Sequence, residues 1–300
     1  MRVLIAYDGS QGATAAIALA ESIAWPDDSH IRVVTVVEPI LMAMSGPWER
    51  GAGYTPELDG VITESANDMM RKAVDRLASS GRSVDGQVLR GRAASAIADD
   101  ARAFQADLVI VGSRGHGAIA SLLLGSVSSE IVDHAPCPVL VARTSTVRKV
   151  IFATDESTTA RMAEGILAAW PIFAGTPIHV VSVAEVIHPW TTGIAPTMYQ
   201  QALDAYAADL REAKGEHERM AADAATRLRE RGRVADAEMR EGDAAAEIVA
   251  VAADQDADLV VLGSRGRTGL SRLLLGSVAR NVLSGSAASV LIVRDGTEAS

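Results

Sequence analysis

Short, almost uninterrupted runs of apolar residues recur along this chain, and longer amphipathic segments separate them. In the first half these runs predict five strands, at residues 2–7, 31–37, 84–90, 108–111 and 139–142. The segments between the strands predict helices at residues 13–24, 57–79, 93–104 and 126–134. Apolar strands that alternate with helices are typical of a parallel sheet with helices on both faces.

The second half repeats this order of elements. Its five predicted strands lie at residues 150–153, 178–183, 234–240, 259–262 and 290–293. Right-handed crossovers between parallel strands give a doubly wound sheet, for which we expect the strand order 3-2-1-4-5. The predicted fold class is therefore α/β, with two tandem, Rossmann-like domains of five parallel strands each, at residues 1–146 and 147–300. The polar joint at residues 143–146 is too short to act as a free linker.

Two motifs support the repeat and define its spacing. Gly112-Ser113-Arg114-Gly115 recurs 151 residues later as Gly263-Ser264-Arg265-Gly266, and residues 122–127 recur at the same distance as residues 273–278. Earlier landmarks, Asp8 with Asp155 and Val36 with Val183, are 147 residues apart. The second half therefore carries four additional residues in a connecting segment, where insertions are tolerated.

The repeated motif is the glycine-rich pattern G-x2-G-x9-G-[ST]. It is formed by Gly112, Gly115, Gly125 and Ser126, and again by Gly263, Gly266, Gly276 and Ser277. We expect the first two glycines to adopt positive φ and to bring backbone N–H groups near an anion. The final Gly-Ser opens a helix, whose N-terminus attracts phosphate, and the serine either caps that helix or binds a phosphate oxygen. The spacing is neither a Walker A loop nor a G-x-G-x-x-G fingerprint, and the alternative is that these are turn and cap glycines only.

The loop falls where a doubly wound sheet binds ligands. In the expected strand order the winding reverses between strands 1 and 4, and ligands sit at the carboxyl ends of the strands at that point. Asp8 follows the first strand and Gly112 follows the fourth, so both belong to the predicted cleft.

These features together resemble the universal stress protein family, twice over, in a tandem form similar to actinobacterial members. Members with this loop bind ATP, with or without Mg²⁺, whereas a branch without the loop does not. The resemblance implies that Asp8 and Asp155 lie at the adenosine, and that the backbone of Val36 and of Val183 meets adenine. It implies phosphate contacts from the loop residues already named and from Val127 and Val278, and it matches Gly91 and Gly242 to a family glycine whose ligand role is less defined. We add Gly9, Arg114, His116, Arg265 and Arg267 to this candidate site.

The two copies differ near the predicted sites. Gly9 is replaced by Glu156, whose carboxylate either faces the phosphates and weakens binding or points to solvent and caps the following helix. His116 is replaced by Arg267, so only the second loop has a permanent cation at that position. We therefore expect two sites of unequal affinity.

The composition of the chain argues against several classes of partner and ligand. With 28 basic against 38 acidic residues the net charge is −10, which argues against nucleic acid. No apolar run approaches the roughly 18 residues of a membrane span, and the N-terminus has no signal-peptide pattern. Together with the single cysteine, Cys137, this predicts a cytoplasmic protein. We expect Cys137 to be a small buried or edge residue rather than a redox switch, and the scattered histidines predict no metal site.

The sequence therefore favours an ATP-binding regulatory protein of the stress response over an enzyme. No set of groups for phosphoryl transfer recurs in both copies, although a slow ATPase remains the alternative. A second alternative is a dimerisation module in which nucleotide is incidental, because residues 139–142 and 290–293 are apolar edge strands. In the family such strands pair domains, so we expect a pseudo-dimer within the chain and, further, a homodimer of whole chains. The charged run at residues 211–219 is interpreted as a solvated helix face.

Overall fold

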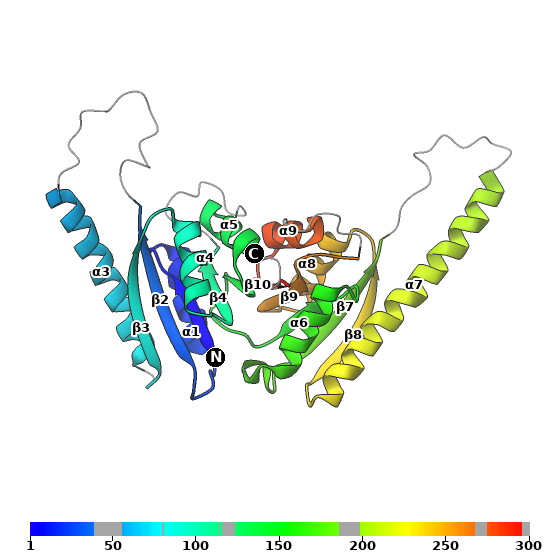
Figure 1. The fold of residues 1–300 in the computed structure, drawn as a ribbon. Coiled ribbons are helices and arrows are strands. Elements are labelled where there is room, and N and C mark those ends of the chain that lie inside the picture. The colour runs from blue at the N-terminus through cyan, green and yellow to red at the C-terminus, as the bar shows by residue number, and fades with distance from the viewer. Residues whose placement is uncertain are drawn as a thin grey trace, which may run out of the picture.

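The two halves of the chain form one continuous ten-stranded sheet, in the order β3-β2-β1-β4-β5-β10-β9-β6-β7-β8 (Figure 1). The computed structural model describes residues 1–38, 56–79, 81–113, 115, 124–185, 199–267 and 275–295. Each half has the predicted strand order 3-2-1-4-5, which confirms two doubly wound α/β domains.

The elements lie close to their predicted positions. Those of the N-terminal half are β1 (Arg2–Ala6), α1 (Gln11–Ser22), β2 (His30–Val37), α3 (Pro56–Ala78), β3 (Ser83–Arg90), α4 (Ala93–Ala103), β4 (Leu108–Gly112), α5 (Ser126–His134) and β5 (Val139–Ala142). Those of the C-terminal half are β6 (Val150–Ala153), α6 (Thr158–Ala169), the 3₁₀ turn η1 (Pro171–Phe173), β7 (Ile178–Ala184), α7 (Tyr199–Glu230), β8 (Ala235–Glu241), α8 (Ala244–Asp254), β9 (Leu259–Gly263), α9 (Ser277–Gly285) and β10 (Ser289–Val293).

The halves join through their last strands. β5 and β10 pair antiparallel, with Leu140 opposite Leu291, whereas all other strand pairs are parallel. Each terminal strand therefore has a partner on both sides, and the expected pseudo-dimer forms within one chain. The outermost strands β3 and β8 are partly exposed, as expected for edge strands.

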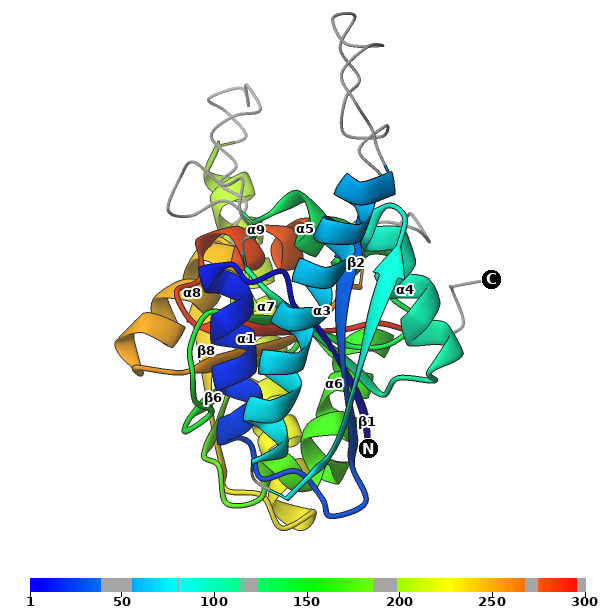
Figure 2. The same ribbon diagram turned by 90° about the vertical axis from the view of Figure 1, so that its left-hand side faces the viewer.

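Two hydrophobic cores, one on each face of the sheet, run through both halves. Residues of α1, α3, α6 and α7 pack on one face, and residues of α4, α5, α8 and α9 pack on the other. Figure 2 shows α1 and α3 side by side on one face, with α4 on the other side of the sheet. Within the described residues, no helix is both long and apolar enough to span a bilayer.

Candidate functional site

An aspartate after the first strand of the C-terminal half organises the loops at the switch point. Asp155 follows β6 by two residues, and its carboxylate accepts the backbone N–H of Ser157 at 3.0 Å and that of Arg267 at 3.0 Å. The hydroxyl of Ser157 in turn caps α6 by accepting the N–H of Ala160. The carboxylate therefore joins the start of α6 to the glycine-rich loop after β9.

The first two glycines of this loop are explained by close contacts. A Cβ on Gly263 would lie 2.4 Å from Oγ1 of Thr159, and one on Gly266 would lie 2.8 Å from Oδ2 of Asp155. Neither residue has positive φ, and neither do Gly112 and Gly115. The prediction of left-handed backbone at these positions is therefore wrong: glycine is needed here because a side chain has no room.

The loop ends at the N-terminus of α9. Gly276 is the N-cap residue and donates its N–H to the carbonyl of Ser264 at 2.8 Å, while Ser277 is the first helical residue. Ser277 is exposed and one position too late to cap the helix. Of the two roles predicted for this serine, capping is therefore wrong. The N–H groups of Ser277, Val278 and Ala279 belong to the first helical turn and have no acceptor within the helix.

These loops enclose a cavity of about 620 Å³ at the carboxyl ends of the strands. Nine of the predicted site residues line it: Asp155, Val183, Gly263, Arg265, Gly266, Arg267, Gly276, Ser277 and Val278. The remaining wall is mostly apolar and includes Val181, Ile248, Leu262 and Leu275. One end of the cavity thus presents a helix N-terminus, and its wall presents apolar side chains.

The N-terminal half has the same framework. Asp8 accepts the N–H of Ser10 at 3.0 Å, and a Cβ on Gly115 would lie 2.7 Å from Oδ2 of Asp8. Gly125 donates its N–H to the carbonyl of Ser113 at 2.9 Å and precedes Ser126, the first residue of α5. The exposed side chain of Val127 lies in the first turn of α5, and Val36 lies near the end of β2. The predicted site residues Arg114 and His116 lie outside the described residues.

A sequence profile of the universal stress protein family matches this chain twice, at residues 1–143 and at residues 146–294. The chain belongs to the universal stress protein family. A universal stress protein of Mycobacterium tuberculosis is 29% identical over 97% of this chain and 94% of its own length. One from Thermus aquaticus is 37% identical, over 47% of this chain and 97% of its own length. The resemblance to tandem actinobacterial members is thereby confirmed.

Solved structures of universal stress proteins have the same fold. The crystal structure of one from Archaeoglobus fulgidus superposes with a TM-score of 0.67, at 17% identity, over 98% of both chains. The structure of a putative universal stress protein from Pseudomonas aeruginosa superposes with a TM-score of 0.62, at 21% identity, over 99% of this chain and 94% of the other.

Glu156 has neither of its two predicted roles at the site of the C-terminal half. It adopts φ of +60° where Gly9 adopts +78°, and its carboxylate pairs with Arg161 at 2.8 Å and Arg227 at 3.2 Å. It does not line the cavity, and the cap of α6 is Ser157. Both alternatives are therefore wrong, because the carboxylate is bound by the two arginines outside the cavity.

The sequence prediction missed His217. Its Nδ1 lies 2.8 Å from Oγ of Ser182, and it lines the cavity with Glu185 and Ala213. Burial lowers the pKa of His217, and Arg267 adds to this effect. At the 151-residue spacing of the repeat, its counterpart in the first half is Ala66.

The interpretation of residues 211–219 as a solvated face is consequently wrong in part. Residues 213–217 are half-buried, and Glu216 pairs with the guanidinium of Arg267 at 2.8 Å. The permanent cation of the second loop is thus already engaged by a carboxylate of α7. Helical spacing contains the missed signal, because Ala213, His217 and the buried Met220 share one face of α7.

Gly91 and Gly242 have a backbone reason to be glycine. Their φ angles are +127° and +144°, in the region that side chains disfavour, directly after β3 and β8. Gly242 does not line the cavity of its half. The two glycines shape the turn after the edge strand.

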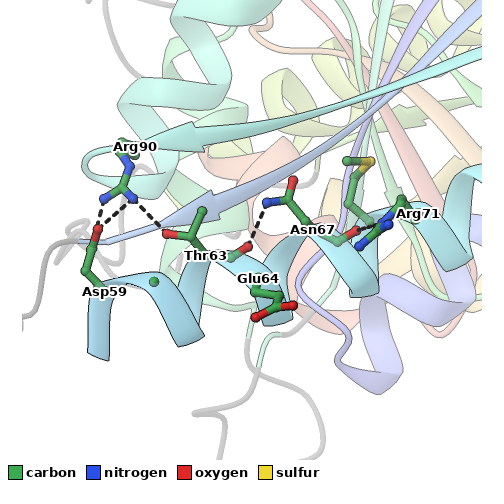
Figure 3. A pocket seen from close by; sticks show the side chains of 8 residues that line it. Asp59, Thr63, Glu64, Asn67, Arg71 and Arg90 are labelled. Carbon is green, nitrogen blue, oxygen red and sulfur yellow. Dashed lines mark hydrogen bonds and ion pairs between the residues drawn. The ribbon is translucent and has the colours of Figure 1, made fainter. Parts of the chain in front are cut away.

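A second hollow, of about 650 Å³, lies along α3 and the end of β3 (Figure 3). Arg90 there binds the carboxylate of Asp59 at 2.8 and 3.0 Å and Oγ1 of Thr63 at 2.7 Å, while Asn67 donates to the carbonyl of Thr63. These polar groups already satisfy one another, and none of the lining residues comes from a glycine-rich loop. The hollow is therefore a weaker candidate than the cavity at α9.

The single cysteine and the acidic residues form neither a reactive thiol nor a metal cluster among the described residues. Cys137 is buried, and burial raises the pKa of its thiol to about 12, so it is the predicted buried residue with little thiolate at neutral pH. Among the described residues, no three His, Cys, Asp or Glu side chains are grouped to hold a metal ion.

Proposed function

We propose that this chain is a cytoplasmic, ATP-binding regulatory protein of the stress response, with one nucleotide site in each half. The observation that carries the proposal is the cavity of about 620 Å³ in which β6, β9 and α9 converge. Its volume falls within the range of about 300–1,000 Å³ typical of small-molecule sites. The site rests on a switch point of the sheet, where such folds bind ligands.

The two ends of the cavity suit the two ends of ATP. The first-turn N–H groups of α9, at Ser277 and its two successors, are donors without helical acceptors and lie at the positive end of the helix dipole. The apolar side chains of Val181, Val183 and Ile248 provide a surface for adenine. Asp155 lines the same cavity, and we propose that it meets a ribose hydroxyl. Phosphate binding then depends on backbone groups, and we propose that any Mg²⁺ arrives bound to ATP.

Aspartate at the first helical position tests each site separately. In Ser277→Asp and Ser126→Asp the new carboxylate lies in the first turn of α9 or α5, where it favours the helix but repels phosphate. We expect calorimetric titration to give two ATP per native chain, one in each single variant and none in the double variant. Ser95→Asp, in the first turn of α4, is the matched control and should retain two.

A thermal measurement provides an independent check. ATP at 100 times its Kd should stabilise the native chain by about 2.7 kcal/mol per site, and the double variant should show no such shift. An unchanged melting temperature of the native chain with ATP and with ADP would contradict the proposal.

An enzymatic role is the second candidate and is measured in the same samples. The charged side chains that line the cavity are Asp155, Glu185, Arg265 and Arg267, and His217 adds a titratable ring. The carboxylate of Asp155 and the guanidinium of Arg267 are already engaged by protein groups. We therefore propose binding without appreciable turnover; steady phosphate release that disappears in the double variant would favour a slow ATPase.

The dimerisation alternative is restricted by the pairing inside the chain. β5 and β10 already bind each other, so the strands that could pair two separate chains are occupied. We propose that a homodimer of whole chains, if it forms in solution, uses other surfaces.

A further inference from the structure

The helices α5 and α9, which follow the two glycine-rich loops, are called the phosphate helices below. The C-terminal end of each is bound by an arginine from the other half. The guanidinium of Arg143, which follows β5, donates to the carbonyl of Leu283 in the last turn of α9. The guanidinium of Arg294, which follows β10, donates to the carbonyl of Val132 in the last turn of α5. The two arginines are 151 residues apart, and so are the two carbonyls, so the contact is reciprocal.

These contacts suit the chemistry of a helix end. The last four carbonyls of a helix lack helical donors and carry partial negative charge, which a cation stabilises. α5 and α9 have nine residues each, and lie side by side at the centre of the molecule (Figure 1). Because such a helix is only about 13 Å long, a shift at its C-terminus displaces its N-terminus as well.

Each arginine is also tied to the glycine-rich loop of its own half. Arg143 directly follows Ala142, whose carbonyl accepts the N–H of Ser113 at 3.2 Å. Arg294 directly follows Val293, whose carbonyl accepts the N–H of Ser264 at 2.7 Å. A path of backbone and guanidinium contacts therefore joins the loop of one half to the phosphate helix of the other.

The connection toward the second site has additional contacts. Asp133 of α5 accepts the N–H of Leu275 at 3.4 Å, immediately before Gly276, and lies 3.6 Å from Arg280 of α9. Its counterpart in the second half is Ser284, whose hydroxyl binds within its own helix.

The backbone of Arg143 is fixed as well. Its N–H donates to Oγ of Ser289 in β10 at 3.0 Å. The counterpart of Ser289 is Pro138, which has no hydroxyl. The contact of the Ser289 hydroxyl therefore cannot form at the equivalent position of the other half.

We propose that Arg143 and Arg294 are positioning residues that act across the halves: Arg143 sets the second nucleotide site and Arg294 sets the first. This inference rests on the proposed ATP sites. It gives a crossed expectation, because the residue of one half controls ATP affinity in the other.

The test measures one site at a time. In the Ser126→Asp background only the second site binds ATP; there Arg143→Met should raise the Kd for ATP at least about fivefold, at the lower end of typical coupling between sites. Arg294→Met should leave that Kd within twofold. In the Ser277→Asp background only the first site binds ATP. There Arg294→Met should raise the Kd for ATP at least about fivefold, and Arg143→Met should leave it within twofold.

Matched variants separate positioning from general destabilisation. Arg82 binds the carbonyls of Glu21 and Ile23 at the end of α1, and Arg233 binds those of Ala168 and Trp170 at the end of α6. Arg82→Met is the control for Arg143→Met, since both arginines belong to the N-terminal half and bind the end of a helix. For the same reason Arg233→Met, in the C-terminal half, is the control for Arg294→Met. Neither control should change the Kd measured in the opposite half, and Arg143→Lys should recover most of the affinity.

The outcomes distinguish the two proposals. If the native chain binds no ATP, the proposed function and this inference both fail before any arginine is changed. If the native chain binds ATP but the arginine variants affect both sites equally, their own half, or neither site, the positioning role alone is overturned.

Discussion

Single residues make the second site chemically different from the first. Glu156 and Arg267 are the differences visible in the sequence, yet each is held in an ion pair, with Arg161 and Glu216 respectively. His217 is a further difference: like Arg267 it lines the cavity, and the first half has Ala66 at the equivalent position. Unequal affinity of the two sites remains a prediction, which rests on the imidazole of His217 as well as on Arg267.

The imidazole should make the stability of the chain depend on pH. Burial lowers the pKa of His217 in the folded chain below its unfolded value of about 6.5. Glu216, Asp155 and Glu185 oppose this shift, and Arg267 supports it. The unfolded chain therefore takes up the proton first, and the free energy of unfolding falls as pH drops below about 6.5.

His217→Gln isolates this contribution, because glutamine can still bond to Ser182 but does not titrate. Between pH 7.5 and 5 the native chain should lose more stability in urea denaturation than the variant does. The other five of the six histidines are common to both proteins and cancel in the difference. Parallel pH profiles would contradict the expectation.

Among the elements, α6 and the end of β9 lie in close contact. Gly263 has no room for a side chain, since its Cβ would meet Oγ1 of Thr159 at 2.4 Å and the N of Ala160 at 2.8 Å. We expect Gly263→Ala to destabilise the chain by about 1–3 kcal/mol, as overpacking generally does. Gly165→Ala is the control: this glycine lies inside α6 with open space around it, so alanine should stabilise by about 0.5–1 kcal/mol. Chemical denaturation measures both, and a Gly263→Ala variant as stable as the native chain would contradict the expectation.

The extent to which sequence predicted these elements follows from their burial. Strands such as β4 are buried at every position, so a continuous apolar run marks both ends. The edge strand β8 has no fully buried residue, and its observed bounds are shifted by one residue from the predicted residues 234–240. The spacing of the glycines predicts where the glycine-rich loops lie, but it does not predict why Gly263 is a glycine. A glycine is required either where φ is positive or where a side chain has no room, and the sequence pattern is the same in both cases. The role of Arg143 had no sequence signal, because it depends on which helix lies opposite.

At the scale of the whole molecule, the halves should unfold together. Both cores contain residues of both halves, and the antiparallel pair β5 and β10 crosses the boundary. We expect one transition, with a calorimetric enthalpy equal to the van't Hoff enthalpy. Gly112→Ala, whose Cβ would lie 2.3 Å from the backbone carbon of Gly12, should lower the melting temperature of the entire chain. Two separate transitions would show that each half is an independent unit.

The pairing of β5 with β10 also determines what sequence change can do to this protein. In an assembly of two identical chains, any substitution appears at both sites at once. Here one polypeptide supplies both partners, so each position can vary alone. Such one-sided substitutions are found at three equivalent positions of the repeat: Glu156 for Gly9, His217 for Ala66 and Ser289 for Pro138. The covalent connection thus permits a division of labour between the halves that a symmetric dimer of one gene product cannot reach.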